Sequence, residues 1–164
     1  MHSESLIQIY DRQLEDGKIR PDPDQQKIAR MLQSLNDNLK KASRPEAGIT
    51  SLLKFFQGGL QEKPLMKGLY IHGPPGRGKS MLMDLFYDNS SVIKRRRVHI
   101  HPFMQEVQAK LHQWRQEGGG KQAKEPLPRL AQEIAAESPL LCFDEFQVEA
   151  VVDAMILRRL FETM

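Results

Sequence analysis

One stretch of the sequence combines residue types and spacing that suit phosphate binding. Residues 73–80 read Gly-Pro-Pro-Gly-Arg-Gly-Lys-Ser and fill every fixed position of the phosphate-binding loop, or Walker A motif. Glycines let such a backbone curl so that successive N–H groups point at phosphate oxygens. Lys79 offers a positive charge to the β- and γ-phosphates, and the Ser80 hydroxyl is a candidate Mg²⁺ ligand. The residues predicted to bind the nucleotide are Gly73, Pro74, Pro75, Gly76, Arg77, Gly78, Lys79, Ser80 and Met81.

The sequence on either side of this glycine loop (residues 73–80) predicts the elements that position it. The short apolar run at residues 68–72 is typical of a buried strand, and residues 81–87 favour a helix that ends at Asp88 and Asn89. Strand, loop and helix is the order that a phosphate-binding loop requires, and the positive end of the helix adds to the site. The alternative is a glycine-rich turn that carries Gly-Lys-Ser without a function.

Two acidic residues supply the second chemical signal. Four apolar residues, 140–143, run directly into Asp144 and Glu145. This pattern predicts a buried parallel strand that delivers carboxylates at its C-terminal end, where open α/β sheets bind ligands. We expect Asp144 to hold Mg²⁺ and Glu145 to orient and deprotonate the attacking water, with Lys79 and Glu145 as the catalytic residues. The alternative is an apolar strand that ends in two solvated acids.

Helices are predicted before the glycine loop, over an N-terminal helical segment of residues 1–64. Residues 6–14 have helical spacing and end at Asp16 and Gly17. Asp22 as N-cap, Pro23 and Gln25 predict a capping box for a second helix. The apolar stripe of that helix is Ile28, Leu32, Leu35 and Leu39, and a short helix is expected at residues 51–57.

The predicted core, residues 65–164, continues after the glycine loop with a strand at residues 98–101 and a helix that begins at Pro102. A glycine-rich breaker at residues 118–121 separates it from a helix that ends at Ser138 and Pro139. The final helix spans residues 151–164. The apolar positions expected to face inward on these three helices are Phe103, Val107, Leu111, Trp114, Leu130, Ile134, Val152, Ile156 and Leu160.

Composition narrows the class of protein. The length of 164 residues and the 40% apolar content fit one globular domain, and the net charge of +3 is too small to indicate nucleic acid as a partner. The single cysteine, Cys142, excludes an internal disulfide and suits a reducing cytosol. The sequence shows neither a signal peptide nor an apolar run of the ~20 residues needed to span a membrane. We therefore expect a cytoplasmic location.

Two weaker signals have competing interpretations. His99 and His101 would share one face of the predicted strand and could bind zinc, but packed or hydrogen-bonded histidines are the favoured interpretation because no third ligand has suitable spacing. The basic run at residues 94–97 could contact phosphate or acidic lipid. A solvated strand entry is favoured, because aromatic residues for base stacking are missing nearby.

Beyond these motifs, longer segments resemble the ZapE cell-division ATPases and their mitochondrial AFG-like relatives, an AAA+ family. The segments that carry the resemblance are residues 17–23, 69–70, 76–87, 96–104, 141–148 and 153–161. The resemblance implies a P-loop NTPase of the AAA+ class, an α/β fold in three αβα layers with parallel strands in the order 5-1-4-3-2. This chain would supply strands 1 to 3, and strand 4, strand 5, the arginine finger and the helical lid would lie beyond Met164.

The resemblance also implies a function. It indicates Mg²⁺-dependent ATP hydrolysis coupled to remodelling of a protein partner, either the division ring with the tubulin-like FtsZ or the substrates of protein quality control. It places residues 22–26 near the adenine and allows a homo-oligomer. Because the arginine finger is expected beyond Met164, turnover by this chain alone is expected to be slow. The alternatives are a nucleotide-binding interaction module without turnover and a DNA-associated AAA+ loader, which the lack of a basic aromatic surface disfavours.

Overall fold

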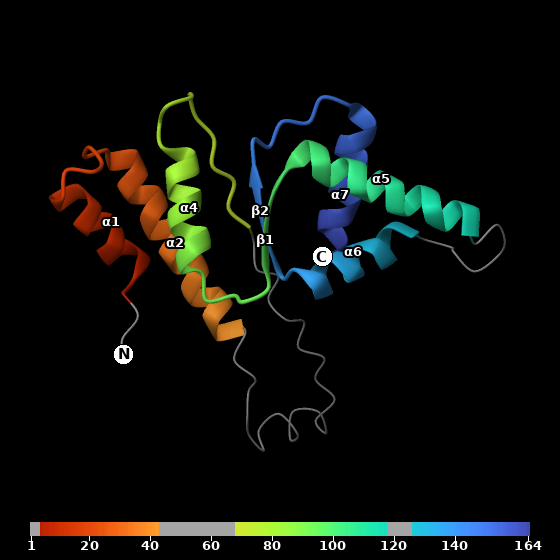
Figure 1. Cartoon of the computed structure of the whole chain (residues 1–164), viewed down its shortest axis with the longest axis horizontal. Helices are drawn as coiled ribbons and strands as arrows, with labels where there is room; N and C mark the ends of the chain where they lie inside the picture. Colours follow the sequence, from red (N-terminus) through yellow and green to blue (C-terminus); the bar gives the residue numbers. More distant parts are fainter. Residues whose placement is uncertain (1–3, 43–67, 118–125) are drawn as a thin grey trace, which may run out of the picture. The chain divides into compact units, whose positions relative to one another are not determined.

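The computed structural model describes residues 4–42, 68–117 and 126–164. The chain divides into two compact units, Met1–Val92 and Ile93–Met164, called the N-terminal and C-terminal units below. The elements of the described residues, labelled in Figure 1, are α1 (Leu6–Glu15), α2 (Pro23–Ala42), α4 (Lys79–Asn89), β1 (Arg95–His99), α5 (Ile100–Glu117), α6 (Pro126–Glu137), β2 (Leu140–Asp144) and α7 (Val151–Thr163). The predicted helix at residues 51–57 and the breaker at 118–121 lie outside the described residues.

Local capping signals define the two N-terminal helices. The Ser5 hydroxyl accepts the N–H of Gln8, and the Gln8 side chain accepts the N–H of Ser5, so α1 begins with a capping box. It ends at Asp16, where Gly17 has the positive φ of 69° that favours glycine after a helix. Both ends of the predicted first helix are therefore confirmed.

Helix α2 begins where the sequence predicts, but its capping box is incomplete. The Asp22 carboxylate accepts the N–H groups of Asp24 at 2.9 Å and Gln25 at 3.3 Å, which confirms Asp22 as the N-cap. The Gln25 side chain bonds instead to Tyr10 and Arg77. Further along the helix, Leu32 and Leu39 of the predicted stripe are buried. Ala29, which the prediction omitted, is buried as well.

The strand predicted at residues 68–72 is not formed in this structure. These residues are irregular, and Tyr70 is 68% exposed. A strand needs the backbone hydrogen bonds of a neighbour, and among the described residues β1 and β2 pair with each other and not with this segment. The helix predicted after the glycine loop is confirmed as α4, and it begins at Lys79, two residues before the expected start.

The C-terminal unit contains a parallel pair of strands. Arg95 of β1 lies opposite Leu140 of β2, and His99 lies opposite Asp144. Most of the basic run therefore forms β1 itself, and α5 begins at Ile100, before the expected Pro102. Proline fits the first turn of α5 because the first N–H groups of a helix have no partner within it. The parallel pair was expected of the second and third strands, and it is consistent with an incomplete αβα fold.

Three helices build the core of the C-terminal unit. The buried side chains that α5, α6 and α7 share are Ile100, Phe103, Met104, Val107, Leu111, Leu130, Ala131, Ile134, Leu157 and Leu160. The prediction for α7 was partly wrong, because Val152 is 64% exposed while the unpredicted Leu157 is buried. Residues 157 and 160 lie three apart and so share a face, and packing against α6 selects that face. In the described residues no helix combines the length and apolar character needed to cross a bilayer.

Cys142 lies at the centre of β2, where it is buried. Burial raises the pKa of its thiol to about 11, although the charges of Arg97 and Arg95 oppose the shift. The thiol therefore stays protonated at neutral pH, which makes Cys142 a packing residue rather than a nucleophile.

We predict that the Arg96–Glu106 ion pair makes the stability of the C-terminal unit depend on acid pH. Hydrogen bonding to Arg96 lowers the pKa of Glu106, so the contribution is complete above the ordinary value of about 4.3 and is lost as the pH falls through the lower folded-state pKa. Glu106→Gln should cost about 1 kcal/mol or less at pH 7, because both side chains are partly exposed, and less at pH 3 than at pH 7.

Urea unfolding followed by the fluorescence of Trp114, the single tryptophan and a residue of this unit, checks the pH prediction. Glu133→Gln is the control, since Glu133 forms only an exposed i,i+4 pair with Arg129. An equal cost of Glu106→Gln at both pH values would contradict the assignment.

Candidate functional site

The glycine loop adopts a backbone that its sequence makes possible. Gly78 is the N-cap of α4 and has φ 76° and ψ 19°, in the left-handed region that favours glycine. A Cβ at this position would lie 2.9 Å from Gln25 Nε2, so close packing also requires glycine here. Gly76 has φ 77° with open space around it, so conformation alone explains that glycine.

The loop leads directly into a helix N-terminus, and its lysine lies across the loop. Lys79 is the first residue of α4, and its Nζ donates to the carbonyl oxygens of Gly73 at 2.9 Å and Pro74 at 2.7 Å. Ser80 follows in the first turn, where it is exposed. The ammonium group, the exposed hydroxyl and the positive end of the helix dipole therefore gather at one end of α4, an arrangement that suits an anion.

The first turn of α2 braces this loop from outside. The Arg77 guanidinium donates to Asp22 at 2.8 Å and approaches Asp24 at 3.3 Å, and the Arg77 carbonyl accepts the Gln25 amide at 3.2 Å. Burial alone would raise the pKa of Asp22, but the two helix N–H groups and Arg77 outweigh burial, so this pKa lies below its ordinary value. Sequence reasoning connected this segment only with the adenine and missed its contacts with the loop.

Asp144 ends β2 in the C-terminal unit and is ion-paired. Arg97 Nη2 donates to Asp144 Oδ2 at 2.7 Å, and the Asp144 side chain is only 19% exposed. Arg97 lies opposite Cys142, two residues before Asp144, so strand alternation places the two charged side chains on one face of the sheet as diagonal neighbours. The pair was not predicted from the sequence, because it follows from strand alternation only once the register of β1 and β2 is known.

Glu145 differs from Asp144 in backbone and exposure. It has φ 51°, a left-handed conformation that costs a non-glycine residue about 1 kcal/mol, and its carbonyl accepts the N–H of Gln147 at 2.7 Å. Its side chain is 84% exposed and lies 3.9 Å from His99 Nδ1, forming an ion pair only while His99 is protonated. Such backbone strain occurs preferentially at functional sites. The Glu145 carboxylate is thus held at the surface, in contact with water.

The predicted metal ligands each carry an oxygen donor. Ser80 in the N-terminal unit has a hydroxyl and Asp144 in the C-terminal unit has a carboxylate, which are hard ligands of the kind that Mg²⁺ prefers. In residues 4–42, 68–117 and 126–164 no group of three or more His, Cys, Asp or Glu side chains could hold a metal. His101 belongs to α5 rather than to the strand of His99, which removes the geometry behind the zinc alternative.

Residues 4–164 match the family model described as AFG1-like ATPase. The chain belongs to the AFG1-like ATPase family. This is a family of P-loop, AAA+ ATPases, which agrees with the glycine loop and with the parallel strand pair. The resemblance noted in the sequence is therefore confirmed over nearly the whole chain.

Curated relatives extend this AFG1-like assignment. The chain is 34% identical over its full length to Cell division protein ZapE of Escherichia coli K12, and 33% identical over 96% of its length to an uncharacterized protein of Schizosaccharomyces pombe. Lactation elevated protein 1 homolog B of Danio rerio is 45% identical over 58% of the chain. The aligned parts make up 44%, 40% and 20% of these three relatives, so the chain spans less than half of each. No solved structure matches the chain.

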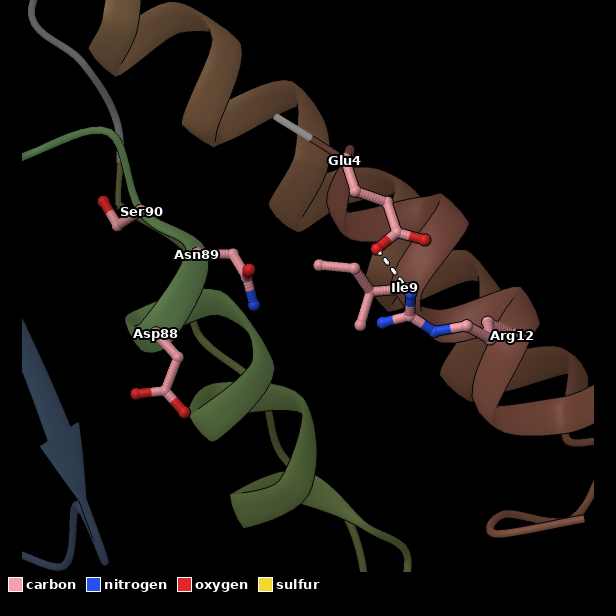
Figure 2. Close-up of a pocket in the computed structure, with 6 residues that line it drawn as sticks. All are labelled: Glu4, Ile9, Arg12, Asp88, Asn89 and Ser90. Carbon is pink, nitrogen blue, oxygen red and sulfur yellow. Dashed lines mark ion pairs between the residues drawn. The ribbon is translucent and has the colours of Figure 1, made fainter. Parts of the chain in front are cut away.

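A separate recess in the N-terminal unit of this AFG1-like chain lies away from the glycine loop. It has a volume of about 470 Å³, and Figure 2 shows its lining of Glu4, which precedes α1, and of Ile9 and Arg12 from α1, with Asp88, Asn89 and Ser90 at the end of α4. A Glu4–Arg12 ion pair of 2.8 Å occupies one wall. Because α4 has eleven residues, this recess lies about 15 Å along the helix from Lys79. It is therefore separate from the glycine loop.

We predict that Gly78→Ala destabilises the N-terminal unit more than Gly76→Ala. Both substitutions incur about 1–2 kcal/mol of left-handed strain. Only the alanine at 78 also displaces the Gln25 amide, which adds about 1 kcal/mol for the lost hydrogen bond. Gly68→Ala, with ordinary φ and open space, is the control and should stay within about 0.5 kcal/mol of the parent. Urea unfolding by circular dichroism measures all three, and equal costs at 76 and 78 would refute the contact.

Proposed function

We propose that this chain binds ATP together with Mg²⁺ through residues 73–81. The observation that carries the proposal is the position of Lys79, whose ammonium group bridges two carbonyls of the loop at the first residue of α4. A phosphate group can replace those carbonyls as the acceptor, and the charge-assisted bonds it forms are stronger. The left-handed glycines and the family assignment support the same site.

Hydrolysis is the reaction that we propose for the AFG1-like chain. A water oxygen attacks the γ-phosphorus, the bond to the bridging oxygen breaks and ADP leaves, while the Glu145 carboxylate accepts the proton of the water. The exposed position of Glu145 supports this role, because water reaches its carboxylate. Lys79 balances the phosphate charge, and Ser80 and Asp144 would hold Mg²⁺. When bound, Mg²⁺ neutralises part of the phosphate charge.

Nucleotide binding without turnover is the second candidate, and one contact favours it. Arg97 occupies an Asp144 oxygen at 2.7 Å, so a metal ion would compete with a guanidinium for that carboxylate. The comparison of Arg97→Gln with the parent separates the two candidates. Faster phosphate release by the variant would support a site held inactive by the Arg97–Asp144 pair.

We propose that ATP turnover remodels a protein partner in the cytoplasm, either in the cell-division ring that contains FtsZ or in protein quality control. The printed name of the Escherichia coli relative, a cell division protein, supports the first of these partners. Because the relatives are more than twice as long as the aligned chain, the coupling to a partner belongs to the whole protein.

We predict that Lys79→Ala weakens ATP binding at least tenfold, or about 1.4 kcal/mol, because the ammonium group is the mobile cation of the glycine loop. Calorimetric titration in the presence of Mg²⁺ measures the affinity. Lys40→Ala removes the same charge from an exposed position in the last turn of α2, and this control variant should bind ATP like the parent. Equal affinities of all three proteins would exclude the glycine loop as the site.

We predict that Glu145→Gln reduces phosphate release about a hundredfold or more while ATP affinity stays within a factor of about two, since the amide keeps the size of the side chain but cannot accept a proton. Glu149→Gln is the matched control, an exposed acid of the same loop. Steady-state phosphate release separates the two variants. If the two lose activity equally, Glu145 is not the base.

A further inference from the structure

We propose that Gln25 is a positioning residue of the nucleotide site, which holds the Arg77–Gly78 peptide in the orientation that phosphate binding needs. The inference rests on the proposed function, since it concerns the same glycine loop. It adds a residue outside the nucleotide motif, 52 positions before Arg77 in the sequence, and assigns it to the loop backbone rather than to the base.

The first observation is that the Gln25 amide covers this peptide. Its Nε2 donates to the Arg77 carbonyl oxygen at 3.2 Å, and the same nitrogen lies 2.9 Å from the point that a Cβ on Gly78 would occupy. The Gln25 amide therefore bonds the Arg77 carbonyl and also packs against Gly78. A change at Gln25 acts on the loop backbone directly.

The hydrogen bond from Gln25 also fixes the direction of the Gly78 N–H. The described residues contain no cis peptide, and in a trans peptide the C=O and N–H groups point to opposite sides. With the Arg77 carbonyl fixed toward Gln25, the Gly78 N–H points away from α2. Loss of the Gln25 bond lets this peptide rotate, which turns away an N–H that the phosphate-binding motif uses.

The third observation is that Gln25 is itself held in place. Tyr10, a fully buried residue of α1, directs its hydroxyl to Gln25 Oε1 at 3.5 Å. Because the Gln25 oxygen accepts from Tyr10, the nitrogen is the end that faces Arg77. The Gln25 backbone N–H is also fixed by the Asp22 cap. The relay from Tyr10 through Gln25 to the loop thus crosses three elements of one unit.

The Arg77 side chain strengthens the same attachment. Its guanidinium bonds to Asp22 at 2.8 Å and lies 3.3 Å from Asp24, both in the same turn as Gln25. Arg77 is therefore bound to the start of α2 through its backbone and its side chain together. The ion pairs hold the Arg77 side chain, whereas the bond from Gln25 reaches the Arg77 carbonyl and so acts on the peptide itself.

Affinity measurements test the proposal with the full chain. Gln25→Met keeps the length of the side chain and removes both hydrogen bonds, and Gln26→Met makes the same change at the exposed neighbour. Calorimetry with ATP and with inorganic triphosphate should show a loss of about tenfold for both ligands in Gln25→Met, and none in Gln26→Met. Equal losses of affinity for ATP and for triphosphate would show that Gln25 acts on the phosphate-binding loop. A loss for ATP but not for triphosphate would assign Gln25 to the base and overturn the proposal, as would unchanged affinity for both.

A second readout needs no ligand. The amide ¹H–¹⁵N resonance of Gly78 in the nucleotide-free protein should shift in Gln25→Met and not in Gln26→Met, and an unshifted resonance would overturn the proposal. If the parent binds neither ATP nor triphosphate, the proposed function fails, and this resonance alone decides whether Gln25 orients the peptide. If Gln25→Met fails to fold, Tyr10→Phe is used as the test variant instead. It keeps the buried aromatic ring and removes the hydroxyl that bonds Gln25, and the expected loss of affinity is about threefold for both ligands. No loss in that case would overturn the proposal.

Discussion

The loop that carries Lys79 is held from outside by the first turn of α2. Asp22 receives two helix N–H groups and the Arg77 guanidinium, while Gln25 bonds the Arg77 carbonyl. A glycine-rich loop loses much conformational freedom when it adopts one backbone, at about 1–2 kcal/mol per residue. Contacts that fix such a loop before a ligand arrives reduce the cost of binding. The start of α2 therefore belongs to the proposed nucleotide site together with the motif.

The positions of Asp144 and Glu145 likewise depend on contacts within the C-terminal unit. Pairing of β1 with β2 places Arg97 beside Asp144 and brings His99 opposite it. The turn after β2 leaves Glu145 strained and exposed, so neighbouring acids have different environments. Asp144 is a partly buried carboxylate that is ion-paired with Arg97, and Glu145 is a carboxylate in contact with water. That difference is what a division of labour between metal ligand and base requires.

The family match identifies the kind of protein, and the structure shows contacts that the family's motifs do not include. The match over residues 4–164 shows that the chain belongs to the AFG1-like ATPase family. The structure adds contacts of the predicted site residues, namely the bracing of the loop by α2 and the ion pair of Asp144 with Arg97. Neither contact is part of the nucleotide motifs. Both involve residues whose partner is 47 or more positions away in the sequence.

Local sequence patterns predicted the helices of the described residues, the cap at Asp22, the strand before Asp144 and the nucleotide motifs, because periodicity and capping depend on residues within one or two turns. Other features depend on contacts between distant segments. Residues 68–72 have the composition of a strand but form none, since a strand needs hydrogen bonds from a partner. Packing against α6 buried Leu157 instead of Val152. The contact of Gln25 with Arg77 and that of Arg97 with Asp144 arise only when distant segments meet, which local sequence patterns do not encode.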